Sequence, residues 1–85
     1  MSATPAELLT GITEIVDEIC GSETAAKVTP TATFDDELEI DSLTMVEIVV
    51  ACEERFSVRI PDEALESLKT VGDAVDYIAK AGVAA

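Results

Sequence analysis

Apolar residues recur every three or four positions in several stretches of the 85-residue chain, and this spacing constrains the fold more than any other feature. Within residues 5–20 these positions are Leu8, Leu9, Ile12, Ile15, Val16, Ile19 and Cys20. In an α-helix, positions spaced in this way share one face. Thr4-Pro5-Ala6-Glu7 supplies an N-cap, a proline at the first helical position and a glutamate for a capping box, and Gly21 supplies a stop. We therefore predict a helix over residues 5–20.

Two more helices and one short helical turn are predicted in the second half of the chain. Asp41 is a suitable N-cap for a helix over residues 42–56. Its expected main apolar stripe consists of Leu43, Val46, Val49, Val50 and Phe56, and Met45, Ile48 and Cys52 widen it. Not all of these can be buried, so Leu43, Met45 and Val46 are either ordinary core or a contact surface for a partner. Pro61-Asp62-Glu63 begins a short turn to about Leu65, and Thr70-Val71-Gly72-Asp73 resembles a cap for a last helix that Gly82 ends.

The remaining segment, residues 21–41, has no sustained periodicity and is expected to be a long loop with short turns. A loop of this length needs attachment to the core, for which Val28, Phe34, Leu38 and Ile40 are the candidates. Strand-like alternation and internal repeats are absent from the sequence. We predict one all-α domain over residues 1–85, a four-helix bundle with three longer helices, one short helix and a long loop between the first and second.

The charge balance restricts the partners. Eighteen acidic residues against five basic ones give a net charge of −13. Nucleic acids and anionic membranes are bound through an excess of Lys and Arg, so neither is an expected partner, and proteins with basic patches are. The N-terminal residues lack a signal-peptide pattern, and the longest apolar run, Ile48 to Cys52, is too short to cross a bilayer. We expect a cytoplasmic protein without membrane insertion.

The groups needed for catalysis or for a dedicated metal site are missing. The chain has no histidine, its lysines are scattered, and no glycine-rich phosphate loop is present, so an enzyme is not expected. The acidic residues from Asp35 to Asp41 lack the ligand order and central glycine of a calcium loop. Cys20 and Cys52 are expected to be reduced and to act as small apolar residues, although a disulfide between them stays open.

One serine stands out at the start of the second predicted helix. Asp41-Ser42-Leu43 follows the acidic stretch Asp35-Asp36-Glu37-Leu38-Glu39. Free N–H groups and the positive end of the helix dipole would favour a phosphodiester on such a serine, although most serines at a helix start are only caps. Taken together with Phe56-Ser57-Val58-Arg59-Ile60-Pro61-Asp62 and Thr70-Val71-Gly72-Asp73, the order of motifs over nearly the whole chain resembles that of the acyl carrier proteins.

The resemblance implies a function for Ser42 and its neighbours. In that family the serine carries 4′-phosphopantetheine, whose thiol holds an acyl group as a thioester. Asp41 and Leu43 would then be recognition residues for the phosphopantetheinyl transferase. A partner-binding surface for synthase enzymes would comprise Leu43, Met45, Val46, Glu47, Glu53 and Glu54. The sequence agrees, since Glu47 and Glu54 share a helix face and lack i,i+4 lysine partners, but a merely solvated face is the alternative.

The same resemblance implies that an acyl chain can fold back between the helices, for which the expected lining is Val16, Val46, Val50, Ile60, Ala64, Leu68 and Val75. The chain also departs from the family pattern. Many members have glycine where this chain has Glu39, so the turn before Asp41 must form without glycine's freedom at positive φ. Arg55 and Arg59 interrupt a region that is often more acidic, which would weaken or redirect some partner contacts.

The leading hypothesis is a discrete, monomeric, non-catalytic acyl carrier protein of bacterial type II fatty acid synthesis. It is similar to actinobacterial members with a large aliphatic residue, here Ile40, before Asp-Ser-Leu. A discrete carrier of a type II polyketide pathway is one alternative. An acidic helical adaptor that is never modified is the alternative from a different class.

Overall fold

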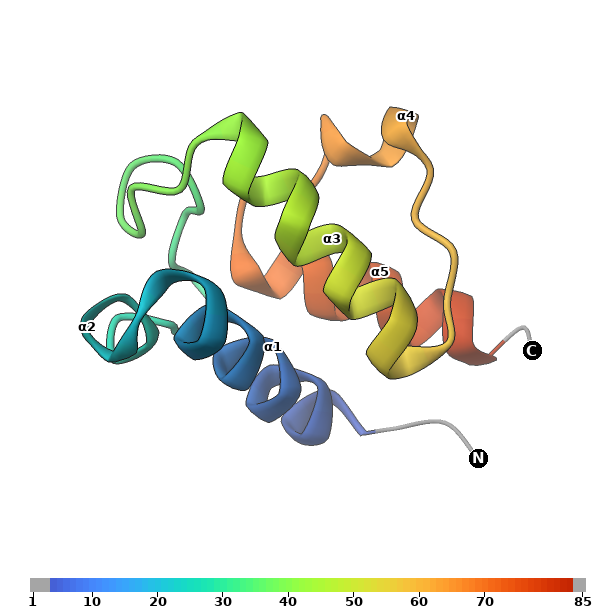
Figure 1. The fold of residues 1–85 in the computed structure, drawn as a ribbon. Helices are drawn as coiled ribbons and strands as arrows, with labels where there is room; N and C mark the ends of the chain where they lie inside the picture. Colours follow the sequence, from blue (N-terminus) through green and yellow to red (C-terminus); the bar gives the residue numbers. More distant parts are fainter. Residues whose placement is uncertain (1–3, 84–85) are drawn as a thin grey trace.

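The computed structural model describes residues 4–83, which form five helices. These are α1 (Pro5–Cys20), α2 (Ser22–Ala25), α3 (Ser42–Phe56), α4 (Asp62–Leu65) and α5 (Val71–Val83). Figure 1 shows the three long helices, α1, α3 and α5, grouped together, with the segment after α2 leading to the start of α3. The predicted all-α fold with three longer helices is confirmed. Residues 1–3, part of the N-terminal stretch expected to lack a signal peptide, and residues 84–85 lie outside the described range.

Local capping fixes the helix starts where the sequence predicts them. At the start of α1, Glu7 N–H donates to Thr4 Oγ1 at 3.2 Å, and Glu7 Oε1 accepts from Thr4 N–H at 3.0 Å. The same reciprocal arrangement precedes α5, where Thr70 N–H and Asp73 Oδ2 lie 3.1 Å apart and Asp73 N–H donates to Thr70 Oγ1 at 3.1 Å. These bonds satisfy N–H groups that have no partner inside the helix.

Two details of the predicted elements are wrong. The segment expected to be only loop and turns contains α2, a single helical turn that begins directly after Gly21 turns the chain at φ 100°. Such a short helix buries none of its residues and so leaves no periodic signal, but it packs against α1. The last helix does not end at Gly82 but continues to Val83, because glycine within a helix costs only about 1 kcal/mol.

The core is built around α1, which packs against α2, α3 and α5. The residues of α3 buried in this core are Ile48, Val49 and Cys52, and Met45 and Phe56 are partly buried. Leu43, Val46 and Val50 of the predicted apolar stripe are 73%, 46% and 46% exposed, so of the alternatives left open for Leu43 and Val46 the structure excludes ordinary core. The buried residues and the exposed residues of α3 both recur at three- and four-residue spacing. The helical period alone therefore does not decide which of the two sets faces α1.

The long segment before α3 is held in place at several points. Phe34, Leu38 and Ile40 are buried and Val28 is half-buried, which confirms their expected role as attachments to the core. The backbone is also tied to the start of α5, where Gly72 N–H donates to Pro30 O at 2.8 Å. A Cβ atom on Gly72 would lie 2.7 Å from the same oxygen, so this close approach requires glycine. The segment therefore presents Asp41 and Ser42 from a fixed position.

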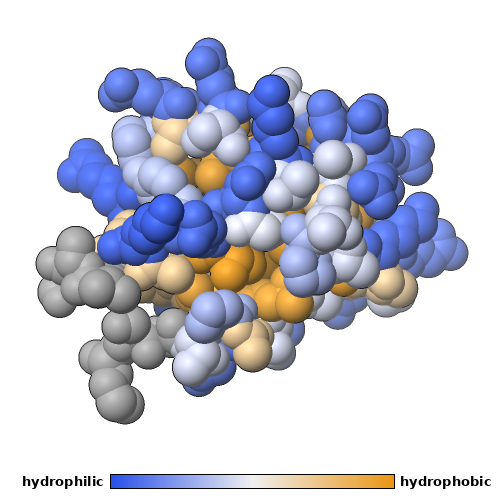
Figure 2. Space-filling view, turned by 180° about the vertical axis from the view of Figure 1, so that it is seen from behind, coloured by the Kyte–Doolittle hydropathy of each residue, from blue (hydrophilic) through white to orange (hydrophobic). Residues whose placement is uncertain are grey.

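The side of the molecule opposite to that of Figure 1 is mostly hydrophilic, with hydrophobic surface gathered towards its middle (Figure 2). Within residues 4–83, none of the helices combines the length and apolar character needed to cross a membrane.

Candidate functional site

Ser42 is the first residue of α3, and its side chain is exposed. The chain reaches it through an anchored turn, in which Ile40 N–H donates to Phe34 O at 2.8 Å and Glu39 adopts φ 53°. The expectation that this turn forms without glycine is confirmed, with Glu39 in the left-handed region. Asp41 is the N-cap, because its Oδ1 accepts a hydrogen bond from Thr44 N–H at 2.8 Å.

The electrostatics at this helix start favour an ionised Asp41 and an unactivated Ser42. The hydrogen bond from the Thr44 backbone holds the pKa of the Asp41 carboxyl below its ordinary value. The sequence has no histidine, and the Asp41 oxygen that faces the helix is engaged with Thr44. A serine without an adjacent base is a poor nucleophile in isolation.

The Ser42 side chain borders a hollow of about 480 Å³. Its apolar lining comes from three segments, the loop before α3, the start of α3 and the end of α4 with the residues after it: Phe34, Ile40, Met45, Leu65 and Leu68. The other lining residues are polar or charged: Thr33, Asp35, Asp36, Asp41, Ser42, Glu66 and Lys69. Of the residues expected to line an acyl site, only Leu68 lies here. The hollow depends on where the loop packs, which the helical pattern does not specify.

The outer face of α3 carries an apolar stripe next to acidic residues. Leu43 and Val46 lie on it as the partner-surface hypothesis requires, and Glu47 and Glu54 are exposed. Val50 extends the stripe but is not among the residues expected to contact partners. Its position four residues after Val46 could have shown that it lies on the same helix face.

Two other expected partner residues have contacts within the chain. Met45 is partly buried, packs against the core and lines the hollow beside Ser42. The Glu53 carboxylate accepts a hydrogen bond from Ile60 N–H at 2.8 Å and so ties the end of α3 to the loop before α4. Any contact that these two residues make with a partner would come in addition to these internal roles.

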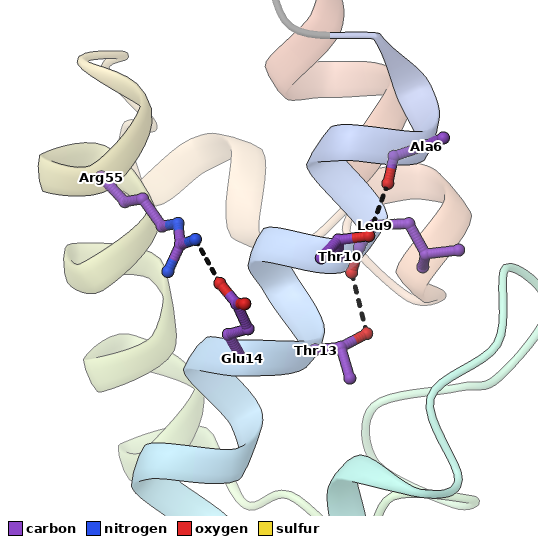
Figure 3. A network of polar contacts seen from close by, with 6 residues as sticks. All are labelled: Ala6, Leu9, Thr10, Thr13, Glu14 and Arg55. Carbon is purple, nitrogen blue, oxygen red and sulfur yellow. Dashed lines mark hydrogen bonds and ion pairs between the residues drawn. The ribbon is translucent and has the colours of Figure 1, made fainter.

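Arg55 is engaged by α1. Its guanidinium forms an ion pair with Glu14, and Figure 3 shows the two side chains pointing toward each other across the gap between α3 and α1. Close by, a Cβ atom on Gly11 would lie 2.5 Å from Phe56 Cζ, so glycine allows the two helices to approach here. The Arg55 charge is therefore paired with Glu14, and the expected effect of Arg55 and Arg59 on partner contacts stays a prediction.

Both thiols are free in the structure. Cys52 is buried, and this burial raises its pKa to about 12. Cys20 is part-buried, and burial together with the nearby carboxylates of Glu47 and Asp41 raises its pKa as well. The thiols therefore act as apolar side chains rather than as reactive groups. Within residues 4–83, no three His, Cys, Asp or Glu side chains converge in a way that would hold a metal ion.

Comparisons with known proteins agree with this geometry. The family model described as "Phosphopantetheine attachment site" matches residues 10–78. The chain is 55% identical to an acyl carrier protein of Acidothermus cellulolyticus over the whole length of both proteins. It is 52% identical to an acyl carrier protein of Thermobifida fusca, over 94% of this chain and all of the relative. A meromycolate extension acyl carrier protein of Mycolicibacterium smegmatis is 51% identical, over 94% of this chain and 80% of the relative.

The helical fold, the exposed serine at the start of α3 and the matches over nearly all of the sequence lead to one conclusion. The chain belongs to the acyl carrier protein family.

Proposed function

We propose that Ser42 is the residue that carries 4′-phosphopantetheine in this acyl carrier protein, and that Asp41 and Leu43 are recognised by the transferase that attaches it. The observation that carries the proposal is the exposed Ser42 hydroxyl at the first position of α3, bordering the hollow. The N–H groups of the first helical turn favour an anion at this position. Ser42 also lies within the segment that the phosphopantetheine attachment model matches.

The residues around Ser42 fit such a group chemically. The free N–H groups of the first turn of α3 suit the phosphodiester end, and buried apolar residues that line the hollow, such as Phe34 and Leu68, suit an aliphatic chain. When bound, the prosthetic group supplies a terminal thiol that forms thioesters with acyl groups. The Ser42 oxygen would form a new P–O bond to the phosphopantetheine of coenzyme A as the pyrophosphate P–O bond breaks and adenosine 3′,5′-bisphosphate leaves. The proton of the Ser42 hydroxyl would pass to a base of the transferase. The protein is thus a carrier rather than an enzyme.

We further propose that the outer face of α3 is where synthase enzymes dock. Leu43, Val46 and Val50 would supply apolar contacts, and Glu47 and Glu54 would attract basic patches. The names of the relatives support fatty acid synthesis as the pathway, since they include meromycolate extension acyl carrier proteins. A polyketide pathway remains the alternative. The cytoplasmic location and the monomeric state expected from the sequence stay predictions.

Incubation with coenzyme A and a broadly specific phosphopantetheinyl transferase tests the attachment site. We expect the intact mass to rise by one phosphopantetheine and Ser42→Ala to abolish the increase. Ser22→Ala is the matched control, because Ser22 is also exposed and is also the first residue of a helix. No increase with a transferase active on another carrier, or an increase that survives in Ser42→Ala, would refute the proposal. An unmodified adaptor predicts the first of these outcomes.

Charge reversal tests the docking face. In Glu47→Lys and Glu54→Lys we expect binding to a ketosynthase-type enzyme to weaken by roughly 3–10-fold, most strongly at low salt, with helicity unchanged. Glu23→Lys in α2 is the matched control, since Glu23 is exposed and makes the same change in net charge. Equal weakening in all three variants would show that only net charge matters and would exclude a specific face.

A further inference from the structure

Lys69 is the one cation among the described residues that line the hollow beside Ser42. The same hollow is lined by four carboxylates, those of Asp35, Asp36, Asp41 and Glu66. Despite these neighbours, Lys69 forms no ion pair within residues 4–83, where the two ion pairs are Arg55 with Glu14 and Lys80 with Asp76. Its side chain is exposed. Lys69 thus lines the same hollow as the proposed attachment site, and its ammonium is not paired with a carboxylate of the described residues.

The backbone of Lys69 holds the side chain at a fixed point. Its carbonyl accepts a hydrogen bond from Phe34 N–H at 3.0 Å, in the loop that leads to Ser42. Its N–H donates to Asp73 Oδ2 at 3.2 Å, in the cap of α5. These bonds join the loop before α3 to the segment before α5. The four-carbon stem of Lys69 therefore starts from an anchored position at the edge of the hollow, and only the stem and the ammonium need to be ordered when an anion appears there.

A phosphodiester on Ser42 would add a negative charge to a site that already carries four. The first turn of α3 offsets part of the repulsion, because its free N–H groups favour an anion. Lys69 lines the same hollow, and an ammonium brought up to the phosphodiester by its flexible four-carbon stem would offset more of the repulsion, since opposite charges in contact attract even in a wet environment. Lys27, in contrast, is exposed but does not line the hollow.

We propose that Lys69 is a positioning residue whose ammonium pairs with the phosphodiester attached to Ser42 and thereby holds the base of the prosthetic arm over the hollow. This inference rests on the proposed function of Ser42. It gives Lys69 a role that appears only after modification, because within residues 4–83 its ammonium forms no ion pair with a carboxylate of the chain.

The test compares the melting temperature Tm of unmodified and modified protein for the wild type, Lys69→Met and Lys27→Met at low salt. Both substitutions remove one positive charge, so Lys27→Met is the matched control. We expect the change in Tm on modification to be about 2–4 °C less favourable in Lys69→Met than in the other two proteins. Lys69→Arg should restore the wild-type change in Tm, and the deficit of Lys69→Met should shrink as salt is raised. The ³¹P resonance of the modified protein should shift in Lys69→Met and stay in place in Lys27→Met.

The possible outcomes separate this inference from the function on which it rests. If the wild type does not accept the prosthetic group, the proposed function fails and the inference fails with it. If all three proteins are modified and Lys69→Met matches Lys27→Met in both Tm change and ³¹P shift, Ser42 remains the attachment site and the role of Lys69 is refuted. If Lys69→Met lowers Tm equally before and after modification, the ammonium only offsets neighbouring carboxylates, which also refutes it.

Discussion

Replacing Glu39 with glycine is expected to stabilise the protein, because Glu39 adopts φ 53° in the turn that leads to Asp41 and Ser42. The left-handed conformation costs a residue with a Cβ atom roughly 1–2 kcal/mol, and glycine avoids this cost. Glycine also loses more backbone freedom on folding, which offsets about 0.4–1 kcal/mol of the gain. The net effect of Glu39→Gly is thus an increase of about 0.5–1 kcal/mol in the free energy of unfolding, or about 2–8 °C in Tm.

Thermal and urea unfolding followed by circular dichroism would measure this effect, and two controls isolate its cause. Glu39→Ala removes the same negative charge but keeps a Cβ atom in the left-handed region. Ser57→Gly relieves the other non-glycine residue with positive φ in the described chain, also at 53°, without changing the charge. We expect both glycine variants to gain stability. A Glu39→Gly protein no more stable than Glu39→Ala would refute the reasoning, because the gain would then come from charge alone.

Three further predictions concern packing, thiol reactivity and charge. Gly72→Ala should lower the free energy of unfolding in urea by about 1–3 kcal/mol, because the new Cβ would lie 2.7 Å from Pro30 O. Helix propensity alone predicts that alanine stabilises the protein, so a stabilised variant would contradict the packing argument. In a mass-spectrometric time course with iodoacetamide at pH 8, Cys20 should be alkylated before Cys52, because a pKa of about 12 leaves the buried Cys52 thiol almost entirely protonated. Equal alkylation rates would contradict this difference in reactivity. Raising NaCl from about 10 to 150 mM should raise Tm, because the Debye length falls from roughly 30 to 8 Å and the repulsion among the charges that sum to −13 is screened. A Tm that does not change would show that this repulsion has little influence on stability.

The close contact at Gly72 illustrates why the sequence predicts helix starts better than packing. The Thr70–Asp73 cap joins residues three positions apart, so it is readable from the sequence alone. The approach of Pro30 to Gly72 joins residues more than forty positions apart, so nothing local indicates it. The hollow beside Ser42 has the same origin, because its lining comes from segments that meet only in the folded chain.

The sequence also does not determine which face of α3 packs against α1. Both the stripe that contains Ile48 and Cys52 and the stripe that contains Leu43, Val46 and Val50 repeat with the helical period. Burial against α1 selects the first stripe and leaves the second for solvent or for a partner. Likewise, only the folded chain shows that Arg55 meets Glu14 and that Glu53 binds Ile60 N–H.

The sequence by itself determined the starts of the main helices, the place of Ser42 at the start of α3, the strongly acidic charge and the lack of a histidine base. These properties depend on composition or on residues within one helical turn of each other. The tertiary structure decided which face of α3 is exposed, where the hollow lies and that Lys69 borders the same hollow as Ser42. These properties depend on contacts between distant segments, which form only when burial of the apolar core sets the relative positions of the helices and the loop.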